Sequence, residues 1–210
     1  MMRRFFSFIL TGILLAGFAS VAWGAGVFGW TDLMYTPTPA TLKPGVLGLG
    51  VNFHEGGFSY FNFDFGVIQN MEFGVTAFNY PDDTDVTLRG KYQVLHENKS
   101  NPGITVGIED LGRDDISPYV TLTKGFDEGM RGYLGVGGGS FDGLFGGFSK
   151  TFSLAKSSSA DQLSQVQLFL EADSIGLNIG TKLQLGATTR INFGLEDMDR
   201  WVMGVTFLIQ

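Results

Sequence analysis

The feature of this chain that most limits its fold is a regular alternation of apolar and polar residues. In the stretch MEFGVTAFN, Met71, Phe73 and Val75 share one parity while Glu72 and Thr76 share the other. Successive side chains of a β-strand point to opposite faces, so a period of two is typical of a strand with one apolar and one polar face. The pattern recurs in about twelve runs, at residues 46–53, 58–67, 71–80, 85–95, 103–110, 118–126, 131–139, 144–153, 165–173, 176–185, 188–196 and 201–209. The sequence therefore predicts an all-β fold.

Turn-forming residues separate these runs and favour antiparallel pairing. Short connections such as IQN, PDDT and GA suit an up-and-down order in which each strand pairs with the next. The region 129–153 fits the pattern least well, because Lys150 shares the parity of Leu144, Phe148 and Phe152. Either a β-bulge shifts the register there or the expected strand boundaries are wrong.

The polar parity of the runs carries charged residues at mid-strand, whereas the apolar parity is almost free of charge. In a transmembrane barrel the apolar face contacts lipid and the polar face lines the lumen. A tilted strand needs about 9–11 residues to cross a bilayer, and most of the runs have that length. We predict an antiparallel up-and-down transmembrane β-barrel of about 12 strands, with 10–14 as the range, over residues 46–210. The lumen-lining candidates are Glu72, Arg89, Lys91, Glu109, Glu171, Lys182, Arg190 and Glu196.

The first 24 residues have the pattern of a secretory signal peptide. A pair of arginines precedes an apolar run over 5–21, and the sequence AWG then places small residues at the two positions that a signal peptidase recognises. We expect cleavage near Gly24. A retained membrane anchor is the alternative, although the run is short for a spanning helix of about 20 residues.

Residues 25–45 contain three prolines, which prevent a helix and favour an extended backbone. We interpret this segment as an extended lead-in to the first strand. The alternative is that it folds into the barrel lumen as a small plug, since irregular backbone at membrane depth needs polar or buried surroundings.

The composition excludes several classes of function. The chain has no cysteine, which removes disulfides, thiolate metal ligands and thiol nucleophiles. Its formal charge of -7 argues against binding nucleic acid through a basic face. The two histidines, His54 and His96, fall in predicted loops at opposite barrel ends, so we expect solvated side chains. We predict no catalytic residue, no cofactor and no metal site; the Asp pairs in PDDT and RDDIS are interpreted as acidic surface loops, with weak calcium binding as the alternative.

The end of the chain, GVTFLIQ, resembles the C-terminal assembly signal of bacterial outer-membrane proteins. In that signal a glycine is followed by hydrophobic residues three and five positions on, which here are Gly204, Phe207 and Ile209. The resemblance implies recognition by the barrel-assembly machinery. An up-and-down barrel also needs its last strand to pair with its first, so that neither sheet edge stays open.

The stretch LMYTPTPATLKPGVLGLGVNF, residues 33–53, resembles the opening of the YjbH-like group of exopolysaccharide-associated outer-membrane barrels. Chains of that group begin with a Pro-Thr-rich segment, then Pro-Gly, then a first strand with alternating glycines. The resemblance implies a link to cell-surface polysaccharide.

Taken together, these patterns predict a non-enzymatic barrel of the bacterial outer membrane that acts as a small pore or as a structural or transport accessory. Its expected partners are outer-membrane lipid, the assembly machinery and a polysaccharide. If the lumen is open, removing one lumen charge should leave folding nearly intact, because lumen substitutions cost less than lipid-facing ones. An outer-membrane enzyme acting on lipid and a secreted soluble β protein are the alternatives.

The first prediction concerns the location of the mature protein. We expect it to begin near Ala25 and to leave the envelope fraction only with detergent, because its apolar strand faces would contact lipid. N-terminal sequencing and fractionation measure both properties. Recovery in a soluble periplasmic or culture fraction would contradict the prediction.

Overall fold

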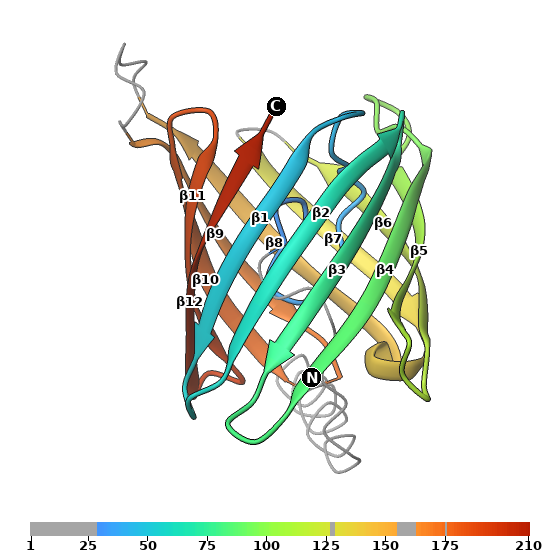
Figure 1. Ribbon diagram of the computed structural model, residues 1–210. Helices are drawn as coiled ribbons and strands as arrows, with labels where there is room; N and C mark the ends of the chain where they lie inside the picture. The colour runs from blue at the N-terminus through green and yellow to red at the C-terminus, as the bar shows by residue number, and fades with distance from the viewer. Residues whose placement is uncertain (1–28, 127–128, 155–162, 175) are drawn as a thin grey trace, which may run out of the picture.

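The chain forms a single closed β-barrel in the computed structural model, which describes residues 29–126, 129–154, 163–174 and 176–210 (Figure 1). The predicted signal peptide and its cleavage site lie outside these residues. The strands are β1 (Leu47–His54), β2 (Ser59–Ile68), β3 (Met71–Asn79), β4 (Thr84–Leu95), β5 (Gly103–Leu111), β6 (Ser117–Gly125), β7 (Met130–Gly137), β8 (Gly143–Ser153), β9 (Leu163–Ala172), β10 (Leu177–Leu185), β11 (Thr189–Glu196) and β12 (Arg200–Ile209). No helix in these described residues is long and apolar enough to cross a membrane.

The predicted fold class is confirmed. Each strand pairs with the next in antiparallel order, and β12 returns to pair with β1. Every expected strand is present, and its boundaries differ from the expected ones by no more than about two residues, the usual uncertainty of element ends. The alternation of side chains was therefore a sufficient guide to the barrel wall.

Closure depends on the final strand. Residues of β12 pair with β1 from Leu47 opposite Ile209 to His54 opposite Val202. Gly204 lies directly opposite Asn52, and a Cβ at Gly204 would lie 2.5 Å from the Val51 carbonyl oxygen and closer still to the Asn52 amide. The glycine of the expected assembly signal thus also permits close packing at the seam.

The outer face of the barrel is apolar, as the alternation predicts. On β12, Trp201, Met203 and Phe207 are exposed, whereas Val202 and Thr206 are buried in the interior. The same division runs around the wall, where the exposed large hydrophobic residues include Phe53, Phe61, Phe73, Val86, Leu122, Leu144, Leu168, Ile179 and Phe193.

The region around Lys150 needs neither of the explanations that the sequence suggested. The strand β8 pairs with β7 and with β9 without a register shift, so there is no bulge and the expected boundaries hold. Lys150 lies near the end of β8 with its ammonium 5.6 Å from the Phe152 ring centre. A lysine at a strand end can keep its charge in water while its stem lies on apolar surface.

The inner face differs from the sequence expectation in one respect. We expected charged, small and polar residues there, but large aromatic side chains also point inward and are buried. They form a cluster with residues 33–35, which belong to the blue segment that lies inside the barrel wall in Figure 1. The barrel members of this cluster are Tyr60, Phe78, Tyr133, Phe169 and Val202.

Removing the last residues of β12 should prevent closure. Deleting Thr206–Gln210 removes four of the eight β1–β12 register pairs and leaves two sheet edges open. We expect no heat-modifiable barrel on a gel after expression. Met203→Ser is the matched control, because it changes one exposed side chain of β12 outside the expected assembly signal and keeps every backbone pair. A heat-modifiable barrel from the deleted chain would contradict the closure model.

Candidate functional site

The interior of the barrel is occupied by residues 29–42, which we call the plug. The plug has no helix or strand, and its side chains of Leu33, Met34 and Thr36 are at most 1% exposed. Leu33, Met34 and Tyr35 pack in the aromatic cluster of the inner wall. Of the two alternatives left by the prolines, the structure therefore has the described part of the segment inside the lumen.

A single carboxylate on β9 holds the centre of the plug. Glu171 accepts hydrogen bonds from the backbone amides of Met34, Tyr35 and Thr36, at 3.2, 2.8 and 3.1 Å. The side chain is 1% exposed, so these amides supply partners that water cannot. In return, Glu171 satisfies three backbone amide groups that belong to no strand and have no β-ladder partner.

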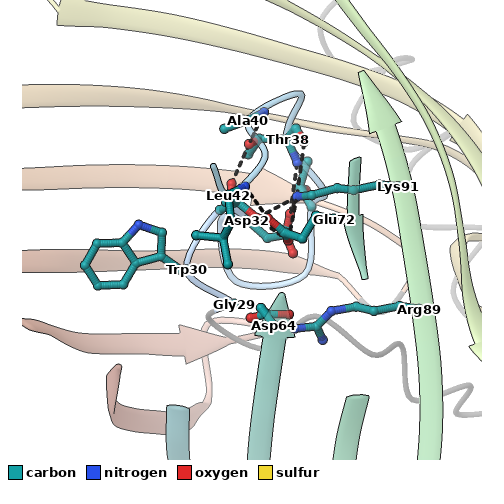
Figure 2. Close-up of polar contacts among 12 residues, drawn as sticks. Gly29, Trp30, Asp32, Thr38, Ala40, Leu42, Asp64, Glu72, Arg89 and Lys91 are labelled. Atoms are coloured by element: carbon teal, nitrogen blue, oxygen red, sulfur yellow. Dashed lines mark hydrogen bonds and ion pairs between the residues drawn. The ribbon is translucent and has the colours of Figure 1, made fainter. Parts of the chain in front are cut away.

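A second group of charges holds both ends of the plug's loop (Figure 2). Glu72 on β3 accepts hydrogen bonds from the Leu42 amide and the Thr31 hydroxyl, both at 2.8 Å. Lys91 on β4 donates to the Asp32 carboxylate at 2.7 Å and to the Thr31 hydroxyl at 2.6 Å. Its ammonium also lies 3.6 Å from Glu72, so one buried cation joins a wall acid and a plug acid.

Asp32 is the charged residue that the plug itself contributes. Burial raises the pKa of its carboxyl, but the charges of Lys91 and Arg89 outweigh burial and hold the pKa below its ordinary value. The ionised carboxylate also accepts the Thr38 amide at 3.2 Å. The plug is therefore attached through charge as well as through apolar packing.

Two cations on β10 and β11 bind plug carbonyl groups. Lys182 donates to the carbonyl oxygens of Gly29, at 3.3 Å, and of Asp32. Arg190 donates to the Trp30 carbonyl at 2.5 Å, and its guanidinium lies 4.1 Å from the centre of the Trp30 ring. The arginine thus contacts both the backbone and the aromatic face of one residue.

Arg89 belongs to the wall rather than to the plug. It forms a buried ion pair with Asp64 on β2 and donates to the Thr76 hydroxyl at 2.7 Å. Breaking a buried pair by removing one partner costs about 3–5 kcal/mol. The expectation that any lumen charge can be removed with folding nearly intact therefore does not suit Arg89, whose loss would leave Asp64 buried without its cation.

The last two candidates, Glu109 and Glu196, have no described hydrogen bond to the plug. Glu109 is 1% exposed and borders a small void of about 10 Å³ together with Asp32, Arg89 and Lys91. Glu196 lies at the far end of β11, where it pairs with His54 and with Arg200 at 3.3 Å. All eight candidates are on the inner parity of their strands, and five of them, Glu72, Lys91, Glu171, Lys182 and Arg190, contact the plug.

The expectation of two solvated loop histidines is wrong for His54. It is the last residue of β1, is 2% exposed, and stacks on the Phe58 ring at 4.2 Å while its ring nitrogen contacts Glu196. The parity of Asn52 continues to His54 on the inner face, because β1 extends one residue beyond the expected end at Phe53. His96 is exposed in its loop, as expected.

Sequence reasoning missed Asp64, Asp32 and Trp30. A signal existed for Asp64, because Phe61, Phe63 and Phe65 flank it on the opposite parity. Asp32 and Trp30 lie in a segment without periodicity, so no pattern could assign them a face. Within the described residues, no group of three or more histidine and acidic side chains is arranged to hold a metal ion.

Comparison with known proteins identifies the fold. No protein-family model and no curated protein matches the chain. A solved KdgM porin is similar with a TM-score of 0.57 and 11% identity, over 79% of this chain and 99% of the porin. A KdgM porin in complex with disordered oligogalacturonate gives 0.56 and 10% over the same shares. At this identity the likeness shows the barrel fold alone, and the resemblance to the YjbH-like group stays a prediction.

Removing the carboxylate of Glu171 should loosen the plug. Because the chain has no cysteine, Thr36→Cys introduces a single thiol at a fully buried plug position. We expect slow labelling by a charged maleimide, and labelling at least about tenfold faster once Glu171→Ala is added, since each hydrogen bond to a charged group contributes about 1.5–3 kcal/mol.

Glu55→Ala provides the matched control for this experiment. Glu55 is an exposed carboxylate that accepts the Trp201 amide, and it lies at the end of the barrel where β1 meets β2. Its loss should leave the labelling rate of the introduced thiol unchanged. Equal labelling of the Glu171→Ala and Glu55→Ala proteins would show that the three amide contacts do not hold the plug.

Proposed function

We propose that this chain is a non-enzymatic barrel of the bacterial outer membrane that passes polar solutes when its plug is displaced. The observation that carries the proposal is the attachment of the plug. A closed wall surrounds the plug, which is bound through buried charges and packing. The plug can leave the lumen without breaking the pairing between any two strands of the barrel.

The exposed surface supports a membrane location. Large apolar side chains cover the outer face of every strand, with Phe53 and Phe61 each 50% exposed and Leu144 75% exposed. A continuous apolar surface of this kind is a liability in water and an advantage in lipid. Only helices and closed barrels satisfy their backbone groups within a bilayer, and β1 to β12 form a closed barrel. Phe207 and Ile209 of the proposed assembly signal lie exposed on this outer face.

The plug is attached in a way that permits release. Among the described residues, the hydrogen bonds that join backbone to backbone within residues 29–42 are local, such as the Leu33 amide to the Thr36 carbonyl at 3.0 Å, and the wall holds the plug backbone through side chains. Backbone pairing with the wall begins at Gly45, whose amide donates to the Gly66 carbonyl at 2.8 Å. Gly45 has a φ of +82°, a conformation that glycine adopts easily. This residue is therefore the natural hinge of the plug.

The solute that the barrel passes would be polar. The inner face carries both signs of charge, and an interior of this kind favours hydrophilic solutes over apolar ones. The YjbH-like resemblance of residues 33–53 and the solved porin complex with oligogalacturonate both support a carbohydrate. We therefore propose an oligosaccharide as the transported class.

The enzymatic alternative is weakened by the geometry of its best candidate. His54 and Glu196 form a base–carboxylate pair, which a hydrolase would need near a nucleophile. Both side chains have no exposed surface, and the ring of Phe58 stacks on the histidine. A lipid substrate could not reach them without rearrangement of the barrel, so the pair serves to join β1 to β11 across β12.

Conductance in planar bilayers tests the proposed function. We expect the wild-type barrel to be closed most of the time and the Glu171→Ala barrel to open far more often, because the plug loses three hydrogen bonds. The Glu55→Ala barrel should match the wild type. Silence of all three proteins would reject transport and favour a permanently closed scaffold, whereas a wild-type barrel that is always open would reject the gate.

A further inference from the structure

A solvent-connected cavity lies at the end of the barrel where β1 begins and β12 ends. Its volume is about 390 Å³, within the range of about 300–1,000 Å³ that small-molecule sites occupy. Plug residues form one side of the cavity and β7, β9 and β11 the other. The lining residues that the argument uses are Trp30, Lys43, Arg131, Tyr133, Gln167 and Arg190.

The charge of this cavity is positive. Lys43, Arg131 and Arg190 line it, and the one acidic side chain among the lining residues is Asp32, which pairs with Lys91 at 2.7 Å. Arg131 is 46% exposed and pairs with Glu97 at 3.0 Å, on the rim. The cavity is therefore suited to a ligand that brings negative charge.

Arg190 is the strongest reason to expect an anion. Its partners in the described part of the chain are neutral: the Trp30 carbonyl, the Gln184 amide oxygen at 3.2 Å and the Trp30 ring. No carboxylate among the described residues forms an ion pair with it. A half-buried guanidinium has five N–H donors in a planar fork that matches a carboxylate, so a ligand carboxylate would supply the missing charge.

The remaining lining groups favour a sugar over a simple ion. Trp30 and Tyr133 provide aromatic surface, and Gln167 provides an amide that can both donate and accept hydrogen bonds. A pocket that combines aromatic surface, an amide and cations suits a ring with hydroxyl groups and a carboxylate. Resting on the proposed transport of oligosaccharides, we propose that this cavity binds the uronate unit of an acidic oligosaccharide.

Calorimetry on the detergent-refolded full mature chain tests the proposal. The probes are trigalacturonate, maltotriose as a neutral trisaccharide, and inorganic phosphate. We expect trigalacturonate to bind at least about tenfold more tightly than either of the others, and its affinity to fall as salt is raised. Equal affinity for maltotriose would reject the role of charge, and equal affinity for phosphate would reject recognition of the sugar.

Variants assign the binding to this cavity. Arg190→Gln should weaken trigalacturonate binding at least about tenfold. Since that change also removes a plug contact, Lys43→Gln offers a second variant at an exposed residue, with a smaller expected loss of affinity. Arg113→Gln is the matched control, because Arg113 pairs with Asp85 at 2.5 Å outside the cavity. Unchanged affinity in both Arg190→Gln and Lys43→Gln would overturn the proposal.

Comparing calorimetry with conductance separates the proposed binding site from the proposed transport. Binding in detergent requires neither a membrane nor an open lumen. Conductance without trigalacturonate binding would remove the site and leave transport standing. Binding without conductance in any variant would keep the site and remove transport.

Discussion

The structure depends on the mutual satisfaction of buried charges and an irregular backbone. A closed barrel turns one parity of every strand inward, where a charge without a partner costs several kcal/mol. Such an interior can bury Glu171, Glu72 and Lys182 only if polar groups form hydrogen bonds with them. The plug meets this need with amides and carbonyls that no strand could provide. Without the plug, these buried charges of the wall would lack hydrogen-bond partners, and without the wall the plug's backbone groups would lack theirs.

Most of the wall could be predicted from the sequence because a strand's faces are set locally. The parity of residues such as Phe207 and Thr206 depends only on the pleat, and a closed sheet leaves no freedom to reverse it. Lys150 is instructive, because it shares the parity of the outward apolar residues of β8 and the strand nevertheless has no shift in register. Its position at the end of β8, which the alternation does not show, makes an outward lysine acceptable.

The candidate site could be predicted only in part, because it is assembled from residues far apart in sequence. Inward parity was enough to select Glu171 and Lys182, but nothing in their neighbourhood indicates that their partners are Tyr35 and Gly29, separated from them by 136 and 153 positions. The inward aromatic residues were missed for a related reason. Tyr60 is apolar on a parity that is otherwise polar, and its burial makes sense only against Met34 and Tyr35 of the plug.

The separation between the plug and its partners determines the order of events during assembly. Trp30 precedes all the strands, yet it contacts Arg190, 160 positions later in the chain. Closing a loop of that length is entropically costly, and such contacts form late. Until β9, β10 and β11 are in place, the plug can contact Glu72 and Lys91 of the earlier strands but not Glu171, Lys182 or Arg190. The first described residues of the chain are thus the last to reach their partners.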